Sequence, residues 1–244
     1  MELTNKVVLI TGASEGIGLA TAQLFARAGA KLALAARSAE KLERVARSLP
    51  DAIAMSTDLR DEQRVKQMVA QTKQYYGRID VLINNAGQGM YVPIEQANLQ
   101  HYRSVFELNV ISVIGVMQAV IPIMREQGGG VIVNISSGLA KTIVPGTGPY
   151  TSTKYALNAI TMTARQELVE DHIRIGLVYP GITATEFNHH LPEGRAEQET
   201  QGRSQAIAMA IESAEQVART ILEAVETEAA EVYTDNLKPF LHPS

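Results

Sequence analysis

Short apolar runs alternate with longer amphipathic stretches along most of the chain. The apolar runs are rich in Val, Ile, Leu and Ala, which is typical of strands that are buried on both faces. They occupy residues 6–11, 31–36, 52–56, 80–83, 131–135, 173–178 and 231–234. In the stretches between them, apolar residues recur every three or four positions, which predicts amphipathic helices. We expect those helices at 19–28, 38–49, from 61 onward, 99–125, 150–170 and 213–226.

This order of elements predicts the fold class. A chain that alternates strands with helices connects parallel strands through right-handed crossovers. We therefore expect an α/β fold with a Rossmann-type, doubly wound parallel sheet of about seven strands and helices on both faces, in three α/β/α layers. The sequence contains no repeat, linker or low-complexity tract, so residues 1–244 are expected to form a single domain. The helix at 99–125 is apolar nearly all round in its second half, which indicates that it is buried or lies in an interface.

Composition and charge narrow the class of protein. The 244 residues are 45% hydrophobic and 20% charged, as in soluble globular proteins. A net charge of −4 gives no basic field for nucleic acid or anionic lipid, so neither is an expected partner. The chain has no cysteine, which excludes disulfides and thiolate chemistry. It shows no signal peptide and no apolar segment of the roughly 20 residues that a membrane span requires, so a cytoplasmic location is expected.

Glycines follow the first predicted strand in the pattern Gly12-x-x-x-Gly16-x-Gly18. A glycine-rich turn between a strand and a helix points backbone N–H groups and the positive end of the helix dipole at a pyrophosphate. A second such turn, 84–87 (Asn-Asn-Ala-Gly), follows the fourth strand and is expected beside the first at the carboxyl edge of the sheet. Either turn alone could be an ordinary tight turn. Their positions in a doubly wound chain favour a dinucleotide site.

Tyr150 and Lys154 open the helix that is predicted after the fifth strand. Residues four apart lie one above the other on the same helix face, so the two side chains point together. A serine at the end of that strand, Ser136 or Ser137, could complete a group suited to acid–base chemistry at a carbonyl or alcohol. Taken singly, a Tyr-x-x-x-Lys pair is more often a solvated helix face, and a serine after a strand is more often a cap.

Six motifs occur together in one order. They are 11–18 (TGASEGIG), 84–87 (NNAG), Asn109, Ser137, Tyr150-x-x-x-Lys154 and 180–185 (PGxxxT). In this order and spacing they make the chain resemble the short-chain dehydrogenase/reductase family, classical type, over residues 6–234. The resemblance implies an oxidoreductase that transfers a hydride between a nicotinamide cofactor and a carbonyl or secondary alcohol.

The resemblance further implies a catalytic set formed by Asn109, Ser137, Tyr150 and Lys154. The family's interval of thirteen residues between the serine and the tyrosine selects Ser137 over Ser136. Tyr150 would exchange a proton with the substrate oxygen, which Ser137 would orient. Lys154 would bond the nicotinamide ribose and, with oxidised nicotinamide, would lower the tyrosine pKa from its ordinary value of about 10. Asn109 would kink its helix and hold a water that relays protons to the lysine.

A dinucleotide site along the loops after the strands is also implied by the resemblance. Residues 12–17 would bind the pyrophosphate and adenosine ribose, 58 and 59 the adenine, 85–87 the ribose, and 183 and 185 the nicotinamide amide and the phosphates. The predicted cofactor-binding set is Gly12, Ser14, Glu15, Gly16, Ile17, Gly18, Arg37, Asp58, Leu59, Asn85, Ala86, Gly87, Tyr150, Lys154, Pro180, Gly181, Thr183 and Thr185.

The end of the second strand bears on the choice between NAD and NADP. NAD enzymes place a carboxylate there, which bonds the 2′-hydroxyl and repels a 2′-phosphate. This chain has Ala36 at that position and Arg37 directly after it, and a guanidinium suits a phosphate dianion. Glu15 stands where NADP-preferring relatives often have a basic residue, so a second cation is missing. We expect NADP(H), with NAD(H) as the alternative.

The substrate pocket is expected beyond the strand carboxyl ends, beside a loop or lid at about 183–212. Its expected lining is mostly apolar, which favours a hydrophobic ketone or aldehyde over a sugar phosphate. The expected wall residues are Gln88, Met90, Tyr91, Leu139, Lys141, Val144, Tyr179 and Phe187. The pair His189-His190 has no further ligands at a suitable spacing, so no metal is expected.

The resemblance is compatible with two other functions, and it also implies an oligomer. The family's 3-oxoacyl-[acyl-carrier-protein] reductase would require a basic docking face, whereas the segment before the fifth strand offers only Arg125. An NADP-binding regulatory or sensor protein would not require the full Asn-Ser-Tyr-Lys set. The helices that begin at Leu99 and Tyr150 carry more apolar surface than one sheet face covers. The resemblance implies that such helices pair into a four-helix interface, in a homodimer or homotetramer.

Overall fold

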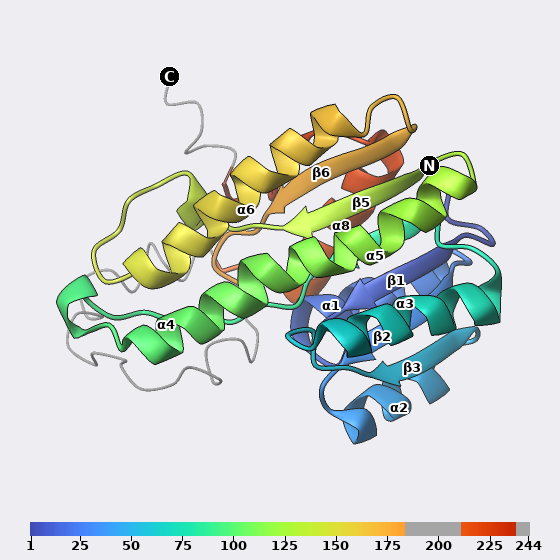
Figure 1. The fold of residues 1–244 in the computed structure, drawn as a ribbon, viewed down its shortest axis with the longest axis horizontal. Coiled ribbons are helices and arrows are strands. Elements are labelled where there is room, and N and C mark those ends of the chain that lie inside the picture. The colour runs from blue at the N-terminus through green and yellow to red at the C-terminus, as the bar shows by residue number, and fades with distance from the viewer. Residues whose placement is uncertain (184–210, 238–244) are drawn as a thin grey trace.

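The computed structural model describes residues 1–183 and 211–237. Seven strands form one sheet in the order β3-β2-β1-β4-β5-β6-β7, and every neighbouring pair is parallel (Figure 1). The strands are β1 (Val7–Thr11), β2 (Lys31–Ala36), β3 (Ala52–Ser56), β4 (Val81–Asn84), β5 (Gly130–Ile135), β6 (Ile173–Tyr179) and β7 (Glu231–Tyr233). The predicted Rossmann-type, doubly wound sheet is confirmed, because each strand coincides with a predicted apolar run.

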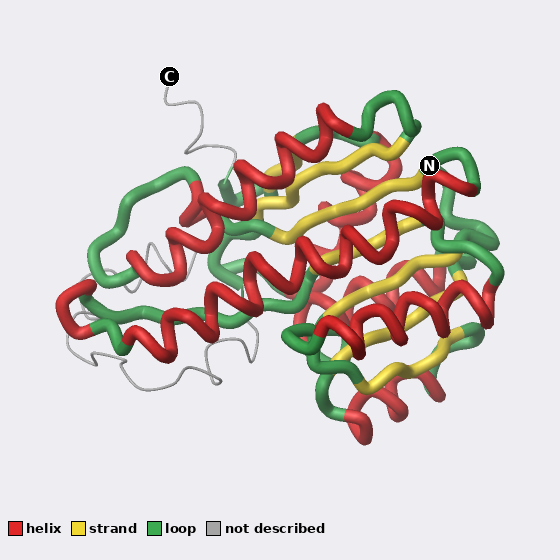
Figure 2. The backbone as a smooth tube through the Cα atoms, in the orientation of Figure 1, coloured by secondary structure: helices red, strands yellow, loops and turns green. Residues whose placement is uncertain are grey.

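Helices cover both faces of the sheet and form the predicted three layers (Figure 2). One face carries α1 (Gly16–Arg27), α2 (Ala39–Arg47) and α8 (Ala214–Thr227), and the other carries α3 (Glu62–Tyr76), α5 (Ser112–Glu126) and α6 (Gly148–Glu167). Side chains alternate across a strand, so Val8 and Ile10 of β1 enter the first core and Leu9 enters the second. Burial on both faces explains why the strands are apolar without interruption.

Local sequence signals set several helix ends. Asp61 caps α3 by accepting hydrogen bonds from two backbone N–H groups, and Ser213 and Gln216 form a capping box at α8. Two helices begin earlier than expected, α1 at Gly16 instead of residue 19 and α6 at Gly148 instead of residue 150. Glycine has a low intrinsic helix propensity, but the packing of these first turns overrides it.

The helix expected at 99–125 is divided into three parts. The helices α4 (Leu99–Phe106) and α5 are joined by a π-helical segment, η2 (Glu107–Ile111). The whole of Leu99–Glu126 is long and apolar enough to cross a membrane, with a mean hydropathy of 1.8 in its most apolar window. The prediction that no segment meets that criterion is therefore wrong. In the fold, α5 packs on the sheet and on α3 within the second core, so the α5 part of this segment is a core helix.

The strand order leaves a crevice at the carboxyl edge of the sheet. From β1 the chain moves outward in one direction through β2 and β3, and in the other direction through β4 to β7. The loops that follow β1 and β4 therefore diverge, and ligands of doubly wound folds bind at such a point. The loops after β5 and β6 continue along the same edge (Figure 1).

Candidate active site

A cavity of about 710 Å³ opens at this edge of the sheet. We call one part the nucleotide end; it is lined by Gly12, Ser14, Glu15, Gly16, Ile17, Ala36, Arg37, Ser38, Lys41, Thr57, Asp58 and Leu59. We call another part the substrate end; it is lined by Gln88, Tyr91, Leu139, Thr142, Ile182 and Leu237. The remaining lining residues are Asn85, Ala86, Gly87, Leu108, Ile135, Ser136, Ser137, Gly138, Tyr150, Lys154, Pro180, Gly181 and Thr183. The structure thus brings nearly all the predicted site residues to one cavity.

Three predicted site residues do not line the cavity as described. Gly18 and Asn109 lie behind the lining, where they pack against residues that form it. Thr185 lies outside the described residues, as do Phe187, His189 and the part of the expected lid between 184 and 210.

The glycine turn after β1 is packed tightly against the turn after β4. Gly12 has a φ of +67°, and a Cβ on it would lie 2.9 Å from the Ala86 Cα atom. A Cβ on Gly18 would lie 2.1 Å from the Gly12 carbonyl oxygen. The Asn85 amide nitrogen donates to the carbonyl oxygens of Thr11 and Gly12, at 3.0 and 3.2 Å. The spacing of the glycines is therefore a steric requirement of this contact.

The first turn of α1 faces the cavity and suits a pyrophosphate. Glu15 occupies the N-cap position but makes no side-chain capping hydrogen bond. The backbone N–H groups of the first turn, before Leu19, therefore have no acceptor within the helix. A phosphate can accept hydrogen bonds from them, and its charge is favourable at the positive end of the helix. A side chain on Gly12 or Gly18 would push this turn out of place. The two glycines therefore let the backbone of the turn come as close to a dinucleotide as binding requires.

Charged side chains are concentrated at the nucleotide end. Arg60 donates to the Asp58 carboxylate at 2.6 and 3.0 Å, and this hydrogen bonding lowers the pKa of Asp58 to about 2. Arg37 is exposed at the cavity wall. Lys41, in the first turn of α2, also lines the wall, and its ammonium lies 2.8 Å from the Glu15 carboxylate. A second cation therefore does line this end, at a position that no motif marked, and it is paired with Glu15.

Tyr150, Lys154 and Ser137 meet between the two ends of the cavity. Tyr150 and Lys154 lie one turn apart near the start of α6, and their exposed fractions are only 6% and 5%. The Ser137 side chain lies beside Tyr150 and acts to lower the pKa of the tyrosine. The hydroxyl of Ser136 instead donates to the Asn158 side-chain oxygen at 2.6 Å, so it is Ser137 that is placed beside the tyrosine.

Burial controls the ionisation of the tyrosine and the lysine. Desolvation raises the pKa of Tyr150 far above its ordinary value, and it lowers the pKa of Lys154 to about 8. The lysine ammonium donates to the Ile135 carbonyl oxygen at 2.8 Å and lies 5.7 Å from the centre of the Tyr150 ring. The expected lowering of the tyrosine pKa is therefore not found in the protein alone, because burial and the neighbouring Tyr91 raise it by more than the Ser137 side chain lowers it. The expectation also counted on the positive charge of the oxidised nicotinamide, which is a property of the bound cofactor and not of the protein.

Asn109 connects the loop after β4 to α6. Its side-chain nitrogen donates to the Gln88 carbonyl oxygen at 2.8 Å and to the Thr153 hydroxyl at 3.0 Å, while its oxygen accepts from the Gln88 N–H at 2.8 Å. It lies in the π-helical segment η2, so the helix widens at this residue rather than only bending. A Cβ on Gly87 would lie 3.3 Å from the Asn109 oxygen and 3.8 Å from the Lys154 nitrogen, which places the asparagine close to the lysine.

The substrate end differs from its prediction. Gln88, Tyr91 and Leu139 line it as expected, and the Tyr91 ring lies 5.5 Å from the Tyr150 ring. Four other expected wall residues are not part of the lining: Met90, Lys141, Val144 and Tyr179. The side chains of Met90 and Tyr179 are buried. Three residues that the sequence did not indicate take their places: Thr142, Ile182 and Leu237. Leu237 follows β7, and a contact from so far along the chain leaves no local pattern.

The turn after β6 is held by residues near the C-terminal end of the described chain. The Gly181 N–H donates to the Glu212 carboxylate and to the Thr234 hydroxyl, each at 3.1 Å. Thr183 pairs with Glu212 in an isolated β-bridge. These contacts position Pro180, Gly181 and Thr183 at the cavity wall.

Known proteins match this fold and site. The family model described as short chain dehydrogenase matches residues 6–196. A 3alpha-hydroxysteroid dehydrogenase of Mediterraneibacter gnavus is 36% identical over 199 residues, which are 79% of this chain and 80% of that protein. The 3-oxoacyl-[acyl-carrier-protein] reductase FabG of Thermotoga maritima is 36% identical over 197 residues, covering 79% of this chain and 80% of the relative.

Solved structures of the same family have a similar fold. The L-sorbose reductase of Gluconobacter frateurii, complexed with NADPH and L-sorbose, superposes with a TM-score of 0.83 at 27% identity, covering 97% of each chain. A short chain dehydrogenase/reductase of Burkholderia phymatum in complex with NAD has a TM-score of 0.86 at 26% identity, covering 99% of this chain and 92% of that one. Fold and site define a nicotinamide-nucleotide-dependent oxidoreductase that acts on CH–OH groups. The chain belongs to the short-chain dehydrogenase/reductase family.

Proposed function

We propose that the protein is an NADPH-dependent reductase of uncharged, hydrophobic ketones or aldehydes and catalyses the reverse oxidation of the corresponding alcohols. The observation that carries this proposal is the meeting of the Ser137 and Tyr150 side chains at the cavity wall between the nucleotide end and the substrate end. A substrate oxygen placed against both hydroxyls would be held at the point where a dinucleotide on the glycine turn reaches the substrate.

The proposed catalytic step follows from the ionisation of these groups. When bound, the nicotinamide supplies the hydride that adds to the carbonyl carbon. Burial keeps Tyr150 protonated at neutral pH, so its hydroxyl donates the proton that the substrate oxygen gains during reduction. Ser137 donates a hydrogen bond that orients the same oxygen. Lys154 stabilises the tyrosinate that remains, and Asn109 positions the loop after β4 against α6.

The preference for NADPH rests on the charges at the nucleotide end. Arg37 and Lys41 both line this end, and Ala36 puts no carboxylate at the end of β2. Arg37 can bond a 2′-phosphate dianion in a bidentate manner, and Lys41, which is paired with Glu15, offsets the charge of that carboxylate. The structural relatives include complexes with NADPH and with NAD, so the support comes from these side chains.

The proposal that the substrate is uncharged rests on the residues that line the substrate end. Among the residues described there, the side chains are Gln88, Tyr91, Leu139, Thr142, Ile182 and Leu237, and none of them carries a charge at neutral pH. A carboxylate or phosphate on the substrate would lose its hydration without gaining a partner, which is costly. Apolar area in the same wall favours a hydrophobic substituent next to the carbonyl.

A coupled assay tests the proposal. The purified protein is incubated with NADPH and a panel of neutral ketones, aldehydes, ketoses and acyl thioesters, and the loss of absorbance of NADPH is followed. We expect turnover of hydrophobic ketones or aldehydes, with a higher kcat/KM for NADPH than for NADH. Tight NADPH binding without turnover of any member would favour the alternative, an NADP-binding regulatory or sensor protein.

An acyl-carrier-protein reductase is the second candidate, because the Thermotoga maritima relative has that name. Such an enzyme requires basic residues near the cavity mouth to hold an acidic carrier protein. Arg125, the cation that the sequence offered, is bonded twice to Asp171, at 2.6 and 2.9 Å. The two residues lie just before β5 and β6, at the amino edge of the sheet and away from the cavity. Thioester turnover that exceeds ketone turnover would favour this candidate.

We also propose that the protein acts in the cytoplasm as a homodimer or homotetramer. Three large apolar side chains of α4, η2 and α6 are exposed: Leu99 at 62%, Ile111 at 43% and Tyr155 at 42%. Burying such side chains against a second copy would remove apolar area from water. A monomeric mass in light scattering at micromolar protein concentration would contradict the assembly.

A further inference from the structure

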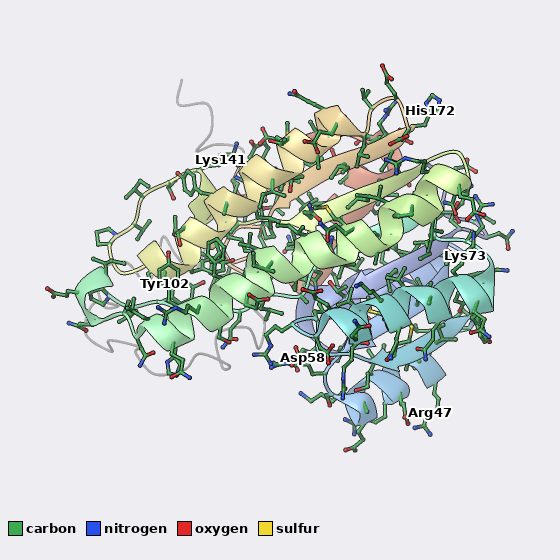
Figure 3. The ribbon with its side chains drawn as sticks, in the orientation of Figure 1. Arg47, Asp58, Lys73, Tyr102, Lys141 and His172 are labelled. Atoms are coloured by element: carbon green, nitrogen blue, oxygen red, sulfur yellow. The ribbon has the colours of Figure 1, made fainter. Side chains whose placement is uncertain are left out.

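Lys141 lies in the loop that forms one wall of the substrate end, but its side chain does not face the cavity. Its neighbours Leu139 and Thr142 line the cavity, whereas the lysine reaches to the outer strand β7. Figure 3 shows Lys141 near the carboxyl ends of β5 and β6, with His172 at the opposite edge of the sheet. The loop wall and the last strand of the sheet are therefore joined by one side chain.

Four side chains make up this contact, and we call them the Lys141 cluster: Lys141, Tyr179, Glu231 and Tyr233. The lysine ammonium lies 2.9 Å from the Glu231 carboxylate and 4.8 Å above the centre of the Tyr179 ring. The two tyrosine rings are stacked, with centres 4.6 Å apart and planes 9° from parallel. Both tyrosine hydroxyls donate to Glu231. The carboxylate thus has three partners, one from each of three chain segments.

Each charge in the cluster is stabilised by the others. Burial acts against the charge of Lys141, but its hydrogen bond to Glu231 and the nearby Tyr233 side chain exceed that effect and raise its pKa. Burial likewise acts against the charge of Glu231, but hydrogen bonds from Tyr179 and Lys141 exceed it and lower its pKa. Both groups are therefore charged at neutral pH. The face of an aromatic ring adds an attraction for the ammonium that water does not replace.

The cluster is connected to both walls of the active site. Lys141 follows the 3₁₀ turn η3 (Gly138–Ala140), which Ser137 begins as its N-cap. On the other side, Tyr179 directly precedes Pro180 and Gly181, which line the cavity, and the Gly138 N–H donates to the Pro180 carbonyl oxygen at 2.9 Å. The ammonium is therefore joined directly to the loop that carries Ser137 and Leu139, and only through Tyr179 to the turn at Pro180.

We propose that Lys141 is a positioning residue for the reaction. Its bond to Glu231 holds the loop at 138–147 against β7, and this keeps Ser137 and Leu139 in the geometry that hydride transfer requires. The inference rests on the proposed function, because it assigns the loop to the substrate. It predicts that loosening the cluster impairs the chemical step and substrate binding but leaves the nucleotide end unchanged.

Three variants and one control separate positioning from general stability. Lys141→Met removes the charge, Lys141→Arg retains it, and Lys141→Met/Glu231→Gln removes both partners. Lys73→Met is the matched control, because Lys73 pairs with Glu126 at 3.4 Å on the far side of the molecule and its side chain is 34% exposed, against 31% for Lys141 (Figure 3). Each variant is compared with the wild type for kcat, KM, the Kd for NADPH and the deuterium isotope effect on kcat.

We expect Lys141→Met to lower kcat/KM for the carbonyl roughly tenfold and to raise the isotope effect, with an unchanged Kd for NADPH. Lys141→Arg should restore most of the activity, and the double variant should be no worse than Lys141→Met, because both changes remove one interaction. The proposal is overturned if Lys141→Met behaves like Lys73→Met, or if all parameters including the Kd for NADPH decline together with thermal stability.

Amide hydrogen exchange tests the same inference without turnover. In Lys141→Met, exchange in a peptide that covers 138–147 should be faster by roughly threefold to tenfold, while exchange at 12–18 should be unchanged. Unchanged exchange at 138–147 would overturn the role of Lys141 even if the wild type is active. Faster exchange in a wild type that turns over no carbonyl would support the contact and contradict the proposed function.

Discussion

The two ends of the cavity are built in different ways. The nucleotide end is built around the backbone of the glycine turn after β1, where Gly12 and Gly18 permit contacts that no side chain would allow. The substrate end consists of side chains that converge from distant segments, such as Tyr91, Leu139 and Leu237. A site made of backbone constrains which residue types can occupy it, whereas a wall made of side chains admits many combinations of similar volume. The first kind of site therefore leaves a motif and the second does not.

Charge separates the two ends as well. Arg37, Lys41 and Asp58 line the nucleotide end, while the described lining of the substrate end is uncharged. Lys154 lies between them, buried, with a pKa of about 8. In our proposal, the enzyme thus recognises its cofactor by charge and backbone geometry, and its substrate by shape and two hydroxyls.

The largest expected effect comes from Tyr150→Phe, which should leave the nucleotide end intact and abolish proton transfer. Loss of a general acid lowers kcat by about 10²- to 10⁴-fold. The Kd for NADPH should stay within about twofold of the wild type, because general acid–base catalysis and binding are separate here. Tyr75→Phe, at an exposed tyrosine of α3, is the control. Near-full turnover by Tyr150→Phe would remove Tyr150 from the mechanism.

Gly18→Ala should damage the nucleotide end instead. Its Cβ would lie 2.1 Å from the Gly12 carbonyl oxygen, so the turn must shift. We expect a loss of roughly 1–3 kcal/mol in the free energy of unfolding from overpacking, and at least tenfold weaker NADPH binding. Urea denaturation and titration of NADPH fluorescence measure the two effects.

Gly115→Ala is the matched control for that change. Gly115 is also in a helix, but a Cβ on it would have no neighbour within 4 Å. Alanine is the better helix former by roughly 0.8–1.0 kcal/mol, so this variant should be as stable as the wild type or more so. If both alanine variants bind NADPH normally, the contact between Gly18 and Gly12 is not what shapes the nucleotide end.

Arg37→Met should change the choice of cofactor. A hydrogen bond to a charged group contributes roughly 1.5–3 kcal/mol, so kcat/KM for NADPH should decrease by about tenfold to hundredfold while that for NADH changes little. Arg44→Met is the control, because Arg44 pairs with Glu40 on the outside of α2. An unchanged ratio of NADPH to NADH efficiency in Arg37→Met would show that Arg37 does not contact the 2′-phosphate.

The smallest expected effect is the pH dependence that Lys154 gives to stability. Its pKa is about 8 in the folded protein and 10.5 as the ordinary value. Between these values the unfolded chain binds more protons than the folded one, so the stability of the wild type relative to Lys154→Met should increase with pH. We expect an increase of roughly 1–2 kcal/mol between pH 7 and pH 9.5, measured by urea denaturation. A difference that is flat or decreases with pH would contradict the buried, easily deprotonated lysine.

Sequence patterns predicted the sheet and the nucleotide end well, for physical reasons. Strands buried on both faces must be apolar, and the glycine turn must lack side chains, so both leave local patterns. Lys41 was missed because a lysine in the first turn of α2 is ordinary in sequence, and only the fold brings it to Glu15 at 2.8 Å. Tyr179 was expected in the pocket, but its hydroxyl bonds to Glu231 of a strand that is remote in sequence. Such contacts depend on tertiary packing, which no periodicity encodes.

Transfer of deuterium from labelled NADPH tests the central claim most directly. NADPH that carries deuterium at C4 is incubated with the protein and a neutral, hydrophobic ketone, and the alcohol product is analysed by mass spectrometry. The account predicts an alcohol with deuterium on the carbinol carbon, formed by the wild type and nearly absent with Tyr150→Phe. Tight binding of NADPH with no labelled alcohol from any ketone or aldehyde would contradict it.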